Sequence, residues 1–163
     1  LILLIPFSMI GVVWGHYFHN FSIGILSWLG IIALIGIMVN DGLVLIGKFN
    51  TYLKEGMKYD EALIQAGKSR FRAIVLTSLT TIAGLAPLLL EKSRQAQFLK
   101  PMAISISYGI AVATILTLVL LPLLLSVSNQ LKVVLKWLKT GKKVTQEEVE
   151  RAIIESKFVH DEE

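Results

Sequence analysis

Apolar residues in this chain are gathered into four long blocks separated by short polar stretches. A helix needs about 20 mostly apolar residues to cross a bilayer. Blocks 23–47, 73–90 and 102–127 approach or exceed that length, and Asp41 is the one charged residue within them. Block 1–14 is shorter because the chain begins inside it. The pattern predicts three complete transmembrane helices and the end of a truncated one.

The segments between these blocks predict an orientation. Residues 48–72 and the tail 128–163 together contain thirteen Lys and Arg residues, whereas residues 91–101 contain three. The positive-inside rule places the more basic side in the cytoplasm. We therefore expect a cytoplasmic loop at 48–72, a periplasmic loop at 91–101 and a cytoplasmic tail. The expected fold is all-α, a polytopic transmembrane helix bundle with its C-terminus in the cytoplasm.

Composition supports a membrane protein and excludes several other classes. The chain is 54% hydrophobic and 17% charged, against about 45–50% and about 25% in soluble domains. Apolar blocks of this number and length disfavour the alternative of core helices in a soluble protein. There is no cysteine, which excludes disulfides and thiolate metal sites. The net charge of +4 is modest, so we expect membrane lipid and no nucleic acid as a partner.

The chain begins at Leu1, inside an apolar block, without the basic opening and cleavage site of a signal peptide. We therefore expect a C-terminal piece of a longer protein. It has neither a Gly-rich phosphate-binding loop nor a Ser/His/Asp set, so we expect neither an enzyme nor a cofactor. His16 and His19 are three residues apart, but two ligands in an aromatic loop are weak evidence for a metal site, and we predict none.

Two helices are predicted outside the spans. In the basic loop, residues 48–55 can continue the preceding span, and 59–65 form a short helix that Gly67 ends. That helix would lie on the membrane surface or belong to a solvated linker, and both remain open. In the tail, Thr145 and Glu148 form a capping box, which predicts a helix from there to about residue 157.

Asp41 is the first candidate for chemistry. It precedes Lys48 by seven residues, which is about 10 Å of helix rise, so it lies within the apolar layer. A charge there costs at least about 2.5–3.5 kcal/mol. Burial away from water favours the neutral acid and a nearby cation favours the carboxylate. A carboxyl group between these influences can take up and release a proton, so we predict a proton relay. A structural aspartate bonded to a neighbouring helix is the alternative.

The span 73–90 supplies hydroxyl groups and a nearby cation. Thr77 and Thr81 are four residues apart and share one helix face, while Arg70 precedes Thr77 by two turns on nearly the same stripe. A Thr hydroxyl both donates and accepts, so it can pass a proton between a carboxylate and water. Taken alone, a packing role for Thr77 is favoured, because Ser and Thr are common where membrane helices meet.

The last span has two rows of small residues at intervals of four, which predict close helix packing. The rows are Ala103–Ser107–Ala111 and Ser105–Gly109–Ala113.

Two sequence runs resemble a known family. They are GIMVNDGLVLI at 36–46 and RFRAIVLTSLTTIAGLAPL at 70–88. Together they look like the last membrane helices of resistance–nodulation–division (RND) efflux permeases of the hydrophobe/amphiphile, AcrB-like multidrug type. The resemblance covers nearly the whole chain, from the end of the ninth family helix to the twelfth, and weakens after about Ser128.

The resemblance implies the last helices of a twelve-helix permease built from two six-helix repeats. It further implies a homotrimer of the full-length protein in the inner membrane, working with a periplasmic adaptor and an outer-membrane channel. Such a permease exchanges protons for exported compounds.

The resemblance also assigns residues to the proton relay. The family's conserved relay Thr falls on Thr77, and an Arg of its proposed proton path falls on Arg70. The drug pumps have a Lys-Asn pair where this chain has Asn40-Asp41, so the lysine that pairs with carboxylates of the fourth family helix is absent. Asp41 would then supply a proton site of its own or bond a fourth-helix aspartate. The proton relay candidates are Asp41, Asn40, Thr77 and Arg70.

Three functions are open on this basis. The first is the membrane portion of a proton-driven exporter. The second is a member of the same superfamily that does not export drugs, such as a lipid transporter or a protein-translocation accessory. The third is a scaffold that uses these helices only for packing.

Overall fold

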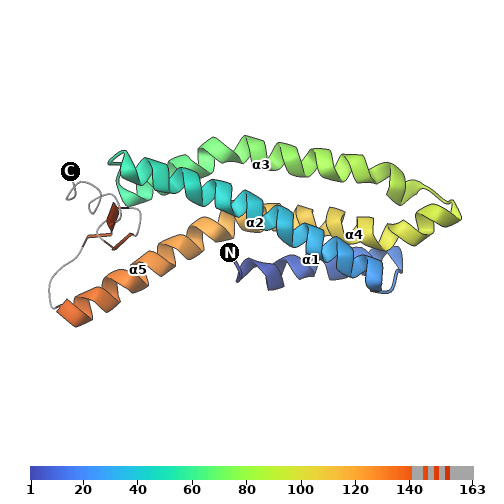
Figure 1. Cartoon of the computed structure of the whole chain (residues 1–163), viewed down its shortest axis with the longest axis horizontal. Helices are drawn as coiled ribbons and strands as arrows, with labels where there is room; N and C mark the ends of the chain where they lie inside the picture. The colour runs from blue at the N-terminus through green and yellow to red at the C-terminus, as the bar shows by residue number, and fades with distance from the viewer. Residues whose placement is uncertain (141–144, 147–148, 151–152, 155–163) are drawn as a thin grey trace. The chain divides into compact units, whose positions relative to one another are not determined.

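The computed structural model describes residues 1–140, 145–146, 149–150 and 153–154. Their long regular elements are all helical, and Figure 1 labels the α-helices. The elements are α1 (Leu4–His19), α2 (Ile25–Lys54), α3 (Tyr59–Leu90), α4 (Arg94–Ile115), the π-helix η1 (Leu116–Leu120) and α5 (Leu121–Thr140). The predicted all-α fold is confirmed for the described residues.

Three helical stretches are long and apolar enough to cross a membrane. They are Ile25–Lys54, Tyr59–Leu90 and the continuous stretch Arg94–Leu138. The predicted spans 73–90 and 102–127 lie within the second and third of these stretches. The predicted span 23–47 lies within the first, apart from its two opening residues, because α2 begins at Ile25. Helix α1 corresponds to the predicted truncated span.

The chain divides into two compact units. Unit 1 consists of Leu1–Leu43 and Phe71–Leu121, and unit 2 of Val44–Arg70 and Pro122–Glu163. Unit 1 thus holds α1, the first part of α2, most of α3 and all of α4. Unit 2 holds the α2–α3 turn and nearly all of α5.

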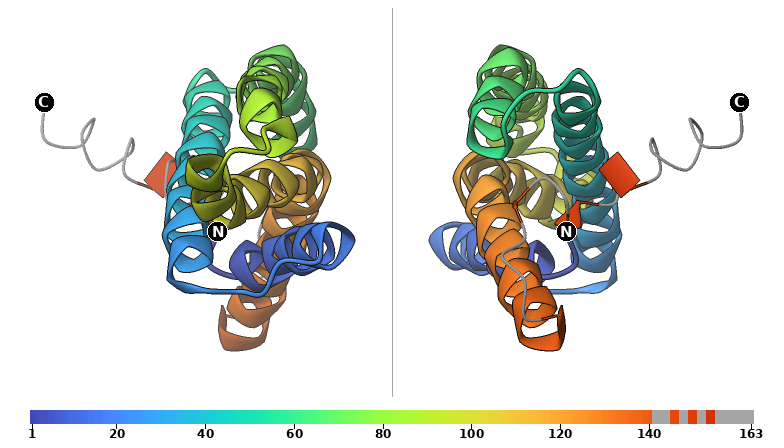
Figure 2. Two further views of the ribbon diagram at one scale, coloured as in Figure 1. Left: turned by 90° about the vertical axis from the view of Figure 1, so that its right-hand side faces the viewer. Right: turned by 90° about the vertical axis from the view of Figure 1, so that its left-hand side faces the viewer.

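In unit 1, helix α1 lies against α4 (Figure 2). Two glycines of α1 make this approach close, since a Cβ on Gly15 would lie 2.6 Å from Cγ of Tyr108. A Cβ on Gly11 would meet the carbonyl oxygen of Tyr108 and lie 2.8 Å from Cγ2 of Val112. These α1 positions must therefore lack a side chain for the two helices to meet.

Helix α2 meets α4 in the same way. A Cβ on Gly30 would lie 2.6 Å from the carbonyl oxygen of Met102 and 2.8 Å from Cβ of Ser105, and Gly109 is covered by the side chain of Leu34. The predicted small-residue row Ser105–Gly109–Ala113 is buried throughout, so it packs as expected.

The other small-residue row is buried only at Ala103 and Ser107, while Ala111 is exposed. Within the described residues Ala111 therefore does not pack closely against another helix, unlike the members of the first row.

Unit 2 is centred on an apolar cluster beside the α2–α3 turn. We call it the turn cluster, and its buried members are Phe49, Leu53, Tyr59, Ala62, Leu63 and Ala66. The rings of Phe49 and Tyr59 meet edge to face with centroids 5.3 Å apart. Gly56 has φ +86°, a left-handed conformation that glycine adopts without steric cost. The chain therefore turns sharply after α2 and starts α3 at Tyr59.

The helical parts of the 48–72 loop are confirmed, but the predicted end at Gly67 was wrong. Helix α2 continues to Lys54, and α3 starts at Tyr59 and runs unbroken through Gly67 to Leu90. A glycine inside a helix costs only about 1 kcal/mol relative to alanine. Burial of Ala62, Leu63 and Ala66 in the turn cluster offsets such a cost.

A π-helical turn joins α4 to α5. The N–H of Leu121 donates to the carbonyl of Leu116, five residues earlier. Pro122 follows directly, and in a regular α-helix its ring would clash with the carbonyl of Leu118, four residues before it. The wider turn accommodates this proline, so the helix continues beyond the predicted span, which ended at residue 127.

The predicted tail helix, with its capping box at Thr145 and Glu148 and its end near residue 157, falls largely outside the described residues. Of the tail beyond α5, residues 145–146, 149–150 and 153–154 are described.

Candidate proton-relay site

Asp41 lies on the buried side of α2. The buried stripe of this helix includes Leu34, Met38 and Leu45, and Asp41 is three residues after Met38 and four before Leu45. Spacings of three and four keep residues on one helix face, and the Asp41 side chain is half-buried. The carboxyl group is therefore at the edge of a packed apolar surface.

Asn40 lies beside this stripe and is exposed. Among the described residues, neither Asn40 nor Asp41 has a side-chain hydrogen bond or an ion pair. The alternative is a structural aspartate bonded to a neighbouring helix. Within the described part of the chain, Asp41 has no such partner.

Thr77 faces outward on α3. Its side chain is exposed, and its hydroxyl donates to the carbonyl of Ala73 at 2.9 Å. The hydroxyl of Thr81 in turn donates to the carbonyl of Thr77 at 2.8 Å. Each Thr oxygen keeps lone pairs free to accept, but a proton passed through Thr77 requires its bond to Ala73 to be exchanged first.

Arg70 belongs to the same unbroken helix, two turns before Thr77. Its side chain is half-buried, and its buried Nε has no hydrogen-bond partner among the described residues. Buried donors in native proteins are nearly always satisfied. Arg70 thus presents a charged donor that the described residues leave unpaired.

The polar pair that joins α3 to α4 is one that the sequence did not single out. Ser78 is buried, and its Oγ lies 2.5 Å from Oγ1 of Thr114. The two hydroxyls also donate to the carbonyls of Ile74 and Ile110 in their own helices. With only two protons for three bonds, the pair cannot satisfy all of them at once. Ser78 therefore faces the packed side of α3 and its neighbour Thr77 faces away.

A second set of polar contacts links α1 to α2 and α4. Nδ1 of buried His16 lies 2.9 Å from the Val12 carbonyl and therefore donates to it. Its Nε2 accepts from the hydroxyl of Ser27 at 2.8 Å, and His19 Nε2 lies 3.1 Å from the hydroxyl of Tyr108. The two histidines thus bond to different helices. No group of three potential metal ligands occurs among the described residues.

These pairs had a weak signal in the sequence. Ser27, Ser78 and Thr114 are polar residues inside apolar blocks, and such residues often join membrane helices. The pairing itself depends on which helices are neighbours, which spacing along the chain does not show.

Residues 1–128 match the AcrB/AcrD/AcrF family. The chain belongs to this family. It is a membrane-spanning fragment of an RND permease, an integral membrane protein. All four relay candidates fall inside the matched region, which ends one residue before Asn129.

The curated relatives of this RND permease chain have different named roles. It is 34% identical over 124 residues to the swarming motility protein SwrC of Bacillus subtilis, which is 76% of this chain and 12% of that protein. It is 32% identical over 120 residues to the nickel and cobalt resistance protein CnrA of Cupriavidus metallidurans, covering 74% of this chain and 11% of CnrA.

A multidrug resistance protein, MdtC of Erwinia tasmaniensis, is 28% identical over 140 residues, or 85% of this chain and 14% of MdtC. The chain therefore spans only 11–14% of the length of these relatives. No solved structure matches it.

Proposed function

We propose that this chain is the membrane portion of a proton-driven exporter and that Asp41 takes up and releases the coupled proton. The observation that carries the proposal is an ionisable group on the buried stripe of an apolar helix without a partner in the described chain. A carboxyl group in hydrocarbon is costly, and protonation or a transient partner offsets the cost. Both are what a proton carrier needs.

Arg70 and Thr77 support the same proposal. Arg70 has an unpaired buried Nε, and a guanidinium stabilises a carboxylate by charge-assisted hydrogen bonds. Thr77 presents its hydroxyl on the outward face of α3. We propose that residues elsewhere in the full-length permease complete the relay with these two groups. Transport of this kind needs no covalent chemistry, so the chain would not act as an enzyme.

The proposed setting follows the family and the charge distribution. The full-length protein would be a homotrimer in an inner membrane, with a periplasmic adaptor and an outer-membrane channel. The basic residues at 48–72 and in the tail favour a cytoplasmic C-terminus. Relatives include a nickel and cobalt resistance protein and a multidrug resistance protein, so divalent metal ions and drugs are both candidate cargo.

The test is the substitution Asp41→Asn in the full-length protein, which keeps the shape of the side chain and removes its proton chemistry. Cells expressing it would be challenged with a panel of cationic drugs and with nickel, cobalt, zinc and cadmium salts. We expect Asp41→Asn to abolish resistance to whichever compounds the wild type exports, while the trimer still assembles.

Asp60→Asn is the matched control, because Asp60 is an exposed carboxylate in the first turn of α3. It should leave resistance unchanged. Export by Asp41→Asn at the wild-type rate would contradict the proposal and would favour a scaffold role for these helices.

A further inference from the structure

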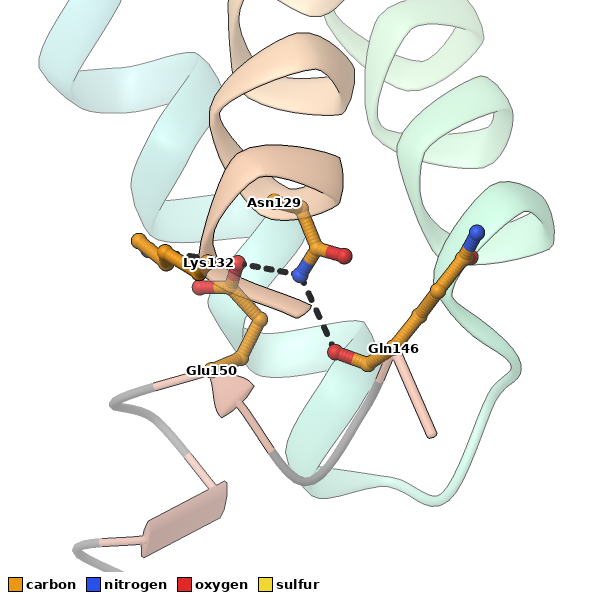
Figure 3. Close-up of polar contacts among 4 residues, drawn as sticks. All are labelled: Asn129, Lys132, Gln146 and Glu150. Atoms are coloured by element: carbon orange, nitrogen blue, oxygen red, sulfur yellow. Dashed lines mark hydrogen bonds and ion pairs between the residues drawn. The ribbon is translucent and has the colours of Figure 1, made fainter. Parts of the chain in front are cut away.

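A buried amide in the first half of α5 is bonded to the C-terminal segment. Asn129 has 1% of its surface exposed. Its Nδ2 donates to the carbonyl of Gln146 at 3.0 Å and to Oε1 of Glu150 at 2.7 Å (Figure 3). An amide nitrogen carries two donors, and here both go to the same short segment. Asn129 therefore holds Gln146 and Glu150 of this segment against α5.

The carboxylate of Glu150 depends on this contact. Its side chain is 13% exposed, and it also lies 3.4 Å from Nζ of Lys132, which is 46% exposed. An ion pair with so exposed a lysine contributes little. The bond from Asn129 is shorter, and hydrogen bonds to a charged acceptor are about twice as strong as neutral ones. Of the two bonds, the amide is thus the main partner of this largely buried charge.

The same segment reaches the turn cluster. Ile153, three residues after Glu150, packs against this cluster, and so does Leu125 of α5. Tyr59, Ala62 and Ala66 of α3 are buried members of the cluster. The segment that Asn129 holds is therefore part of the packing around the first turns of α3.

Helix α3 connects this packing to Arg70, one of the relay candidates. The helix is unbroken from Tyr59 onward, so Arg70 follows Ala66 by one turn. A regular helix fixes the rotation of each residue relative to those one turn away. Any change in how the cluster holds Ala62 and Ala66 changes the setting of Arg70.

We propose that Asn129 is a positioning residue for proton coupling: it holds the C-terminal segment in place at Gln146 and Glu150, and through the turn cluster this segment sets the rotation of the first turns of α3, which carry Arg70. This inference rests on the proposed function. Asn129 and the segment lie outside the residues that match the family, which end at 128.

The test substitution is Asn129→Asp in the full-length permease, reconstituted in proteoliposomes. Aspartate has the same shape as asparagine but has a carboxylate oxygen in place of the amide N–H groups. Both hydrogen bonds are then lost, because this oxygen would lie against the two acceptor oxygens of Gln146 and Glu150. Hydrogen exchange at residues 59–66 should speed up at least tenfold. The maximal export rate should fall at least threefold, and the proton concentration for half-maximal export should change. The KM for the exported compound should stay within twofold.

Two further variants and a control make this result specific. Asn129→Asp combined with Glu150→Gln restores one hydrogen bond with the donor and acceptor exchanged, and should recover at least half of the lost rate. The permease truncated after residue 144 lacks both acceptors, Gln146 and Glu150. It should show the same faster exchange and lower export rate as Asn129→Asp, and it tests the proposal independently if the Asn129→Asp protein does not fold. Ser128→Ala changes an exposed neighbour, and should behave as the wild type.

The outcomes separate the two proposals. Faster exchange with an unchanged rate and proton dependence would reduce Asn129 to a structural role and overturn the inference alone. Unchanged exchange in both Asn129→Asp and the shortened protein would also overturn it. Wild-type export that does not depend on a proton gradient would overturn the proposed function and this inference together.

Discussion

Polar side chains are paired differently in two regions of the chain: the interface among α1, α2 and α4, and the outward stripe of α3. At the interface, His16 bonds to Ser27 and His19 to Tyr108, each across two helices. On the stripe, the described residues give the Thr77 hydroxyl a bond to the backbone of its own helix and leave the buried Nε of Arg70 without a partner.

This difference in pairing distinguishes polar residues that pack membrane helices together from polar residues that are candidates for function. A polar group that is paired within the chain is already accounted for by helix association. A polar group left open on an apolar helix carries a cost that something else must offset. The interface residues therefore belong to the first kind, and Asp41 and Arg70 belong to the second. Thr77 lies between the two, because its hydroxyl is bonded to its own helix but exposed.

The largest expected effect is on the packed side of this comparison. Gly11→Val would place a branched side chain against the carbonyl oxygen of Tyr108, where even a Cβ does not fit. We expect it to lower the free energy of unfolding of the full-length protein by about 3 kcal/mol. Thermal unfolding in detergent measures this.

Gly67→Ala is the control for that substitution, because nothing lies within 4 Å of a Cβ at this helical position. It should be neutral or stabilise by up to about 1 kcal/mol. Equal unfolding temperatures for the Gly11 and Gly67 variants would show that α1 does not pack closely on α4.

The next prediction contrasts two adjacent hydroxyls. Thr77→Ala should reduce export at least tenfold, because it removes the hydroxyl proposed to pass the proton. It should leave stability unchanged, because the Thr77 side chain is exposed and its described bond goes to Ala73 of the same helix. Ser78→Ala removes the bond to Thr114 and should cost about 0.6 kcal/mol of stability with export nearly intact. Export assays and thermal unfolding of the same preparations test both halves. The reverse pattern would place the functional hydroxyl on the packed side.

The last prediction concerns the histidine contacts, where only stability is expected to change. Ser27→Ala leaves Nε2 of buried His16 without its hydrogen-bond partner and should destabilise the protein by about 1 kcal/mol. Tyr108→Phe removes the bond to His19, which is only partly buried, and should cost less. Unfolding measurements that rank the two variants the other way would contradict this account of the interface.

Much of the fold follows from the sequence because bilayer thickness sets the length of each apolar block. That physical limit made the spans within α2, α3 and the α4–α5 stretch predictable. Gly67 was misjudged because a local propensity of about 1 kcal/mol competes with burial in the turn cluster, which the chain order does not show. The π-turn at 116–120 had a signal in Pro122, but its geometry depends on the neighbouring carbonyls.

The sequence singles out the candidate residues of the relay but does not show their contacts. Asp41 stands out because it is the one charge in an apolar block. The pairs Ser78–Thr114 and Asn129–Glu150 join positions 36 and 21 residues apart, and no pattern of period 3.6 predicts such pairs. Only the packing of the helices shows that Ser78 is turned inward and Thr77 outward.

The most direct test of the central claim is infrared difference spectroscopy of the full-length permease in lipid, recorded between acidic and neutral pH. If Asp41 takes up a proton, the wild type will show a carboxylic-acid carbonyl band that is missing in Asp41→Asn and retained in Asp60→Asn. Identical spectra for the wild type and Asp41→Asn would contradict the account.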